Sequence, residues 1–286
     1  MVVILYSAMV HAMVHAPMAM VHAPARFAAT PRVSAAMMSK VIRTYAASDL
    51  PSQWPFTAED MRRIDESPDI SFYDQPRFVT HIDDAAIAAI TSHYREVLTP
   101  GADVLDLCSS WVSHLPEELE LGRVAGVGMN ARELEANPRL TEFVQADLNA
   151  DPTLRFADAS FDAVLNVVSV DYLSSPRKVF AEMHRVLRPG GVATMSFSNR
   201  MFATKAVAVW LDSDDAGRQE IVATYFATSP EGGWEAIEVL DARAGRGAAA
   251  AAAGGGGLLA GLLGGLGEAL SSAGDPMYVV QARKRA

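Results

Sequence analysis

The sequence predicts an α/β fold: a mostly parallel sheet with helices on both faces and a C-terminal antiparallel hairpin. Three observations support this. Half of the 286 residues are apolar and a fifth are charged, the balance of a globular protein. Between residues 101 and 197, short apolar runs alternate with helical patterns. Beyond residue 197 the pattern changes to two helical segments followed by two strand-like runs.

The first predicted helix begins after Asp83 and Asp84, which occupy positions typical of N-caps. Pro100 and Gly101 end it. The spacing of its apolar residues places them on one face: Ile87, Ile90, Tyr94 and Val97.

Five strands and two helices follow in alternation, which indicates a parallel sheet covered on both faces. Pro176 suits the first turn of the second of these helices, and Pro189-Gly190-Gly191 stops it before the next strand. The predicted strands are 104–107, 124–127, 143–145, 161–168 and 192–197, and the helices are 131–136 and 176–187.

The C-terminal part contains a predicted helix at 200–211 and a second at 216–228. The runs 235–240 and 277–282 are expected to form the hairpin, joined by a low-complexity Ala/Gly/Leu insertion at 244–274. The entropy cost of closing a loop grows only logarithmically with its length, so the fold should tolerate this insertion.

The N-terminal leader, residues 1–47, has the composition of an organelle transit peptide. No Asp or Glu precedes Asp49, so the four Lys and Arg residues of the leader give it a charge of +4, and the remainder must carry −14 for the total of −10. We expect a chloroplast address, with the mitochondrion as the alternative. The predicted organisation continues with a helical or lid segment at 48–100, a core at 101–243, the insertion, and a final strand within 275–286.

Composition excludes several classes of protein. A net charge of −10 argues against a nucleic-acid partner, because phosphate backbones require clustered Lys and Arg. The insertion has fewer apolar residues than the ~20 that a membrane-spanning helix needs. Cys108 is the one cysteine, which excludes an internal disulfide, and the histidines show no metal-binding spacing.

Ligands of open parallel sheets bind at the carboxyl ends of the strands. Four motifs occur in this order within or beside the predicted strands: Val104-Leu105-Asp106-Leu107, Gln145-Ala146-Asp147-Leu148, Ser160-Phe161-Asp162-Ala163-Val164 and Leu187-Arg188-Pro189-Gly190-Gly191. Their series resembles class I S-adenosylmethionine-dependent methyltransferases of type 11, whose fold is Rossmann-like. A wider match, which includes residues 72–81, 108–114, 196–200 and 275–280, is similar to a plant and algal methyltransferase-like group, many of whose members have plastid-type leaders.

The resemblance implies S-adenosylmethionine as the cofactor and assigns roles to several strand-end residues. Asp106 matches the acidic residue that organises the loop around the methionine part, and Asn166 begins the stretch beside the transferable methyl group. Asp147 and Leu148 match the pair that contacts the adenine.

Two departures from the family pattern weaken the predicted cofactor site. The loop after the first strand has Cys108, Ser110 and Val112 where glycines are usual, and Gly128 stands where an acidic residue usually holds the ribose. Treated as separate costs, they add to ~3–5 kcal/mol of lost cofactor affinity. Ser109 and Ser110 could compensate by binding the cofactor's carboxylate, and Asn130 by reaching the ribose.

The leading hypothesis is therefore a methyltransferase acting on a small-molecule substrate. Asp171, Tyr172 and His81 are candidate catalytic residues, since each lies near a strand end or in the segment before the sheet. The alternative is a catalytically silent binding or scaffold protein of the same fold. A nicotinamide dinucleotide is a further alternative, because residues 126–131 fit G-x-G-x-x-A. Cys108 is a candidate nucleophile, and the alternative is that its side chain only packs in the loop. The oligomeric state is left open.

Overall fold

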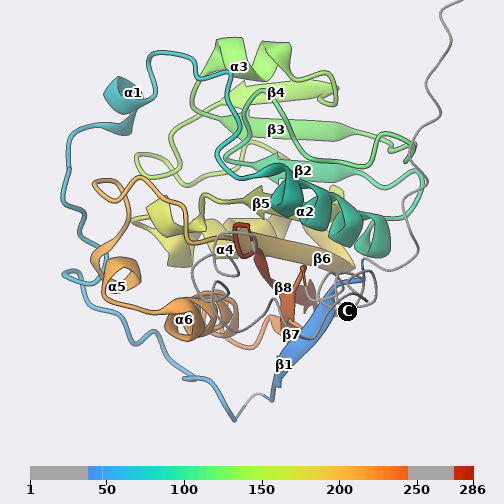
Figure 1. Ribbon diagram of the computed structural model, residues 1–286. Helices are drawn as coiled ribbons and strands as arrows, with labels where there is room; N and C mark the ends of the chain where they lie inside the picture. The colour runs from blue at the N-terminus through green and yellow to red at the C-terminus, as the bar shows by residue number, and fades with distance from the viewer. Residues whose placement is uncertain (1–37, 47, 244–273) are drawn as a thin grey trace, which may run out of the picture. The chain divides into compact units, whose positions relative to one another are not determined.

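One mixed sheet of eight strands organises the residues described by the computed structural model of the protein, 38–46, 48–243 and 274–286 (Figure 1). Its strand order is β1-β7-β8-β6-β5-β2-β3-β4. The strands are β1 (Lys40–Tyr45), β2 (Val104–Leu107), β3 (Val124–Gly128), β4 (Glu142–Gln145), β5 (Phe161–Val167), β6 (Leu187–Phe197), β7 (Trp234–Asp241) and β8 (Tyr278–Lys284).

The pairing confirms the predicted fold class. Strands β2 to β6 pair in parallel, with β2 between β3 and β5. The last two strands form the predicted antiparallel hairpin, and β8 also pairs antiparallel with β6. The chain runs from β2 outward through β3 to β4 and then returns to β5 on the other side of β2. This change of direction is the switch point at which such sheets bind ligands.

Two apolar clusters cover the two faces of the sheet. Alternate residues of a strand point to opposite faces, so Val104 packs against α2 (Asp84–Val97) while Leu105 belongs to the cluster of α4 (Pro176–Val186) and α6 (Asp215–Ala227). Helices α1 (Asp69–Phe72), α3 (Ala131–Ala136) and α5 (Ala208–Leu211) and the short 3₁₀ turn η1 (Val170–Tyr172) complete the elements. None of the described helices is long and apolar enough to cross a bilayer.

Most element predictions are confirmed to within one or two residues, including the N-cap of α2, where the Asp83 side chain accepts from the amide of Ala86. The predicted helix at 200–211 is wrong, because only Ala208–Leu211 is helical. The amide of Val207 donates to the carbonyl of Asp171, and that of Ala208 to the carbonyl of Arg62. These long-range bonds occupy amides that a continuous helix would need.

Strand β1 corrects the predicted extent of the leader. Residues 40–45, assigned to the leader from composition, pair antiparallel with β7 and form one edge of the sheet. The rest of the leader, to residue 37, and the insertion between residues 244 and 273 lie outside the described residues.

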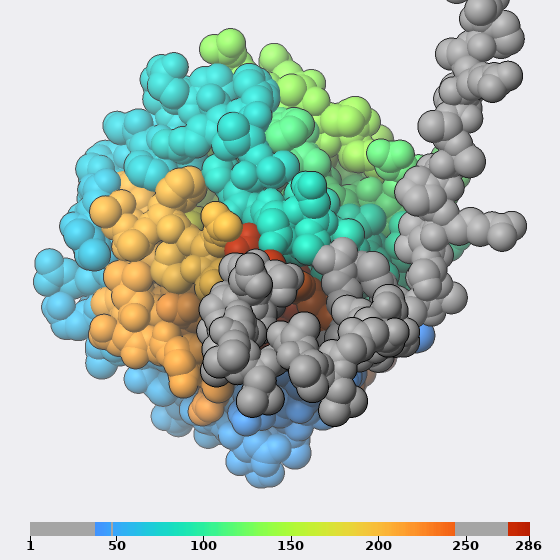
Figure 2. All heavy atoms as spheres, in the orientation of Figure 1, coloured from blue at the N-terminus to red at the C-terminus, as the bar shows by residue number. Residues whose placement is uncertain are grey.

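A buried ion cluster holds the segment before α2 against the segment before α5. The Lys205 ammonium, fully buried, lies 3.1 Å from carboxylate oxygens of both Asp65 and Asp69, and it donates to the carbonyl of Ser67. Arg63 donates to both oxygens of Asp69 at 2.7 and 2.8 Å. The surfaces of the two segments adjoin in the space-filling view (Figure 2). Two cations thus face three carboxylates, because Arg63 also lies 3.9 Å from a carboxylate oxygen of Glu66.

Candidate ligand-binding site

A cavity of about 620 Å³ opens at the carboxyl ends of β2, β3 and β5, at the switch point. Its size is that of typical small-molecule sites. The segments 69–82 and 199–202 complete its walls. It brings together all but two of the predicted site residues: His81, Asp106, Cys108, Ser109, Ser110, Asn130, Asp147, Leu148 and Tyr172. Asn166 and Asp171 are not among its lining residues.

The loop after β2 is folded onto its own carboxylate. Oδ2 of the buried Asp106 accepts from the hydroxyls of Ser109 and Ser113, both at 2.7 Å. Asn137 adds a further tie by donating to the Ser110 carbonyl and to the Ser113 hydroxyl. Burial raises the pKa of Asp106 to about 6, although the two hydroxyl hydrogen bonds act in the opposite direction. Asp106 thus joins two side chains of the loop that follows β2.

The closed loop also explains the glycine at the end of β3. A Cβ atom on Gly128 would overlap the carbonyl oxygen of Ser109. The amide of Ser109 meanwhile donates to the carbonyl of Val127, which fixes the loop in place. The loop therefore occupies the space that a side chain at position 128 would need. The two departures therefore belong to one packing arrangement, in which the β2 loop requires a glycine at position 128.

Of the three residues that replace the usual glycines, only Cys108 has a left-handed backbone, at φ +56°. His114, at φ +52°, is the second such residue of the loop. Burial, with a contribution from Asp106, raises the pKa of the Cys108 thiol to about 12. A thiol protonated at neutral pH is a poor nucleophile, which favours the packing role for Cys108.

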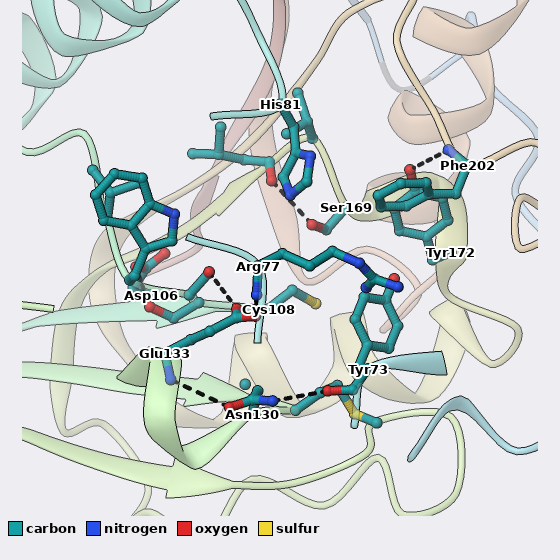
Figure 3. Close-up of a pocket in the computed structure, with 18 of the residues that line it drawn as sticks. Tyr73, Arg77, His81, Asp106, Cys108, Asn130, Glu133, Ser169, Tyr172 and Phe202 are labelled. Atoms are coloured by element: carbon teal, nitrogen blue, oxygen red, sulfur yellow. Dashed lines mark hydrogen bonds between the residues drawn. The ribbon is translucent and has the colours of Figure 1, made fainter. Parts of the chain in front are cut away.

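The first turn of α3 binds the segment that crosses the cavity (Figure 3). The Asn130 amide nitrogen donates to the carbonyls of Tyr73 and Asp74, while its oxygen caps α3 by accepting from the amides at positions 132 and 133. Glu133 accepts from the Ser110 hydroxyl at 2.5 Å and from the amide of Arg77 at 2.6 Å. Both ends of Asn130 are therefore engaged by protein groups, which leaves the amide no spare donor for a ribose.

Asp147 differs from Asn130 and Glu133 because one of its side-chain oxygens accepts no hydrogen bond from the described residues. Oδ1 accepts from the amides of Asn149 and Ala150, which closes a turn after β4. Oδ2 has no hydrogen-bond partner within the described residues, and the side chain lines the cavity. Leu148 beside it is buried and adds an apolar wall. This pair offers an accessible acceptor next to a flat apolar surface.

Asn166 and Asp171 lie behind the cavity wall. Asn166 is buried at the end of β5 and donates to the carbonyl of Leu107. Asp171 is also buried, and burial raises its pKa to about 7. Asp171 interacts with the hydroxyl of Tyr172, which in turn accepts from the amide of Phe202 at 2.8 Å. Asp171 thus lies next to a residue of the cavity wall without lining the cavity itself.

An aromatic group forms the wall opposite the strand ends. Phe202 lies at its centre, with ring centroids 5.3 Å from Phe72, 6.0 Å from Tyr172 and 5.4 Å from His81. The Arg77 guanidinium lies 5.5 Å from the Phe202 centroid. Burial, followed by the charge of Arg77, lowers the pKa of His81. This wall therefore holds a neutral imidazole at neutral pH.

Sequence reasoning missed Arg77, Glu133, Ser113 and Phe202 as lining or supporting residues. One signal was available: Asn130 followed three residues later by Glu133 fits the pattern of an N-cap with an acidic residue in the first turn. Phe202 was hidden by the incorrect helix at 200–211. Ser113 acts through a side-chain contact that spacing alone does not predict.

Comparison with known proteins supports a methyltransferase-type core. Residues 112–195 match the family model described as a methyltransferase domain. The match covers less than half of the chain and begins after Asp106 and the Cys108–Trp111 part of the loop. No curated protein matches the chain.

Solved structures give distant similarities. An S-adenosylmethionine dependent methyltransferase from Mesorhizobium loti is 17% identical over 67% of this chain and 95% of that one, with a TM-score of 0.43. The [4+2]-cyclase SpnF is 17% identical over 76% and 90%, with a TM-score of 0.46. A chain from the Haloferax volcanii complex with the methyltransferase activator Trm112 is 19% identical over 40% and 60%, with a TM-score of 0.31. These similarities are too distant to assign an activity. The domain match itself implies S-adenosylmethionine as the cofactor of this core.

Proposed function

We propose that the protein transfers a methyl group from S-adenosylmethionine to a small-molecule acceptor, at oxygen, nitrogen or carbon. The observation that carries this proposal is the cavity of about 620 Å³ at the switch point of a core that matches a methyltransferase domain. The predicted catalytic and cofactor residues that converge there support it.

The residues fit the cofactor at one end of the cavity. The free Oδ2 of Asp147 and the apolar Leu148 suit an adenine with an exocyclic amine. At the other end, the proposed compensations do not fit this conformation, because Ser109 and Ser110 donate their hydroxyl protons to Asp106 and Glu133. Binding of the methionine carboxylate there requires backbone donors or a change of these bonds.

When bound, the cofactor supplies an electrophilic methyl group, and the chain's contribution is orientation. Tyr172 and Phe202 form a rigid wall, since the Phe202 amide donates to the Tyr172 hydroxyl. His81 is neutral at neutral pH and lines the cavity, so its ring can accept a proton from the acceptor. Asp171 is buried beside Tyr172, with which it interacts.

The test is calorimetric titration of the full chain with S-adenosylmethionine and with its demethylated product. The full chain is used because β1 pairs with β7. We expect micromolar binding that Asp147→Ala weakens by roughly 10–150-fold, the effect of one charged hydrogen bond. The matched control is Asp151→Ala, which removes a carboxylate from the same turn outside the cavity. The absence of binding up to millimolar ligand would overturn the proposal.

A catalytically silent binding protein is the second candidate, and the closed β2 loop favours it. The hydroxyls of Ser109 and Ser113 bond Oδ2 of Asp106 without any ligand, and position 128 has no room for a side chain. A folded protein that fails to bind S-adenosylmethionine in the titration above would support this candidate.

The structure does not support a nicotinamide dinucleotide site at residues 126–131. Its pattern begins on β3, whereas β2 precedes it as a central strand paired on both sides. A dinucleotide site of this type would use the turn after the first strand.

We further propose that the leader directs the protein to the chloroplast. Its acid-free composition supports the proposal. A fluorescent-protein fusion of residues 1–47 tests the address: accumulation in plastids is expected, and accumulation in mitochondria would favour the alternative.

A further inference from the structure

The cavity contains two arginine side chains with different electrostatic surroundings. Arg200 donates to Asp275 at 2.9 Å, so its charge is neutralised by an ion pair. Arg77 forms no ion pair within the described residues. Its Nη2 donates to the carbonyl of Phe72 at 2.8 Å, and its backbone amide to Glu133. The Arg77 guanidinium is therefore an unmatched positive charge at the cavity.

Part of this guanidinium remains open to a ligand. Nε and Nη1 form no hydrogen bond within the described residues, and neither is among the buried polar atoms that lack a partner. Arg77 is one of the residues that line the cavity. In the close-up the side chain extends across the cavity toward Tyr73 and Tyr172 (Figure 3).

Aromatic rings hold the guanidinium in place. Its central carbon lies 4.5 Å from the Phe72 centroid and 5.5 Å from those of Tyr73 and Phe202. These contacts stabilise the cation without consuming its hydrogen-bond donors. The other cations nearby, Arg63 and Lys205, are already matched by Asp65 and Asp69. One fixed, uncompensated guanidinium therefore faces a cavity wall made of flat rings.

We propose that the acceptor is a flat small molecule with one carboxylate, which Arg77 binds while the rings of Tyr73, Tyr172 and Phe202 contact its body. A guanidinium matches a carboxylate in both geometry and charge. The carboxylates of Glu133 and Asp147 also line the cavity, so a phosphate dianion would meet more repulsion there than a single carboxylate. The role of this molecule as methyl acceptor rests on the proposed function, whereas its binding by Arg77 does not.

The test uses two probes of the same shape, 2-naphthoate and 2-naphthamide, titrated into the full chain by ligand-detected NMR. We expect naphthoate to bind at least tenfold more tightly than naphthamide. Arg77→Gln should abolish this preference, and Arg77→Lys should reduce it because the planar fork is lost. The matched control is Arg132→Gln, which changes the net charge equally at an exposed residue outside the cavity. Thermal melts establish that each variant is folded.

Equal affinity for the two probes, a preference that survives Arg77→Gln, or no binding of either probe at millimolar concentration would overturn the proposal. S-adenosylhomocysteine is titrated into the same samples. Its binding in a protein without carboxylate preference overturns the acceptor class and leaves the proposed function standing. Carboxylate preference in a protein that does not bind S-adenosylhomocysteine overturns the proposed function and leaves the Arg77 site standing.

Discussion

The loops after β2 and β4 both place an aspartate at the cavity, but they use it in different ways. Asp106 is buried and bonded to two serine hydroxyls of its own loop. Asp147 is partly exposed, closes a turn with one oxygen and leaves the other free. Both hydroxyls bond Oδ2 of Asp106, so each carboxylate keeps one oxygen without a hydrogen bond among the described residues. The difference is that Asp106 is buried and tied to side chains of its loop, whereas Asp147 is partly exposed and bonded only to backbone amides. The contrast shows that an acidic residue at a strand end acquires its role from the donors that surround it.

The largest expected effect comes from adding a methyl group under the closed loop. Gly128→Ala would place its Cβ against the Ser109 carbonyl, which cannot move without breaking the loop, so we expect a loss of about 3 kcal/mol in the free energy of unfolding. Gly126→Ala, on the same strand, would meet only the flexible end of Leu140 and should cost less than about 1 kcal/mol. Urea denaturation measures both. Equal losses would contradict the closed loop as the cause.

The second effect is a pH dependence contributed by Asp106. Its pKa is raised in the folded state to about 6, so its contribution to stability is fully present below pH 3.8 and is lost as the pH rises through 6. We expect the wild type to lose about 2–3 kcal/mol relative to Asp106→Asn between pH 4 and 7, and nothing further above pH 7. Subtracting the two unfolding curves removes the contribution of Asp171. A difference that does not change with pH would contradict the assignment.

A smaller loss is expected from Ser113→Ala, which removes a donor to Asp106 and an acceptor for Asn137. A hydrogen bond to a charged group contributes about 1.5–3 kcal/mol, and we expect destabilisation near the lower end. Ser160→Ala removes an exposed hydroxyl that donates only to a carbonyl, and should cost less than about 1 kcal/mol. Chemical denaturation compares the two, and equal costs would mean that the loop hydroxyls are not structural.

The smallest expected change is the stability of Asp147→Ala. Removing its turn-closing oxygen should cost no more than about 1 kcal/mol, although the same substitution is expected to weaken cofactor binding. Thermal and urea unfolding check this separation of stability from binding. A loss as large as that of Gly128→Ala would show that the two loops do not differ in the way described.

The sequence predicted the sheet, the helices on both faces and most element boundaries, because periodic apolar residues and caps are local signals. It also placed most candidate residues at the cavity, since strand ends in a parallel sheet converge. Two segments were mispredicted for physical reasons. Residues 200–207 are apolar enough for a helix, but bonds from Val207 and Ala208 to distant carbonyls prevail. Strand β1 was concealed by the composition of the segment around it.

The coupling between Gly128 and the β2 loop was beyond sequence reasoning. Each departure from the family pattern is visible separately, but only the position of the Ser109 carbonyl shows that one requires the other. The hydrogen-bond partners of Ser109, Ser110 and Asn130 were equally hidden, because side-chain rotamers decide them. Sequence patterns located these groups without showing which were already occupied.

Strand β1 contributes mainly through its backbone, because five of its six side chains are exposed. It covers the outer edge of β7, whose amides and carbonyls would otherwise be open to pairing with another chain. Removal of the proposed leader before Lys40 would preserve this cover, whereas a cut within 40–45 would uncover up to five residues of β7, Ile237 to Asp241. The position of the cut would thus decide whether β1 or β7 is the edge strand of the mature protein.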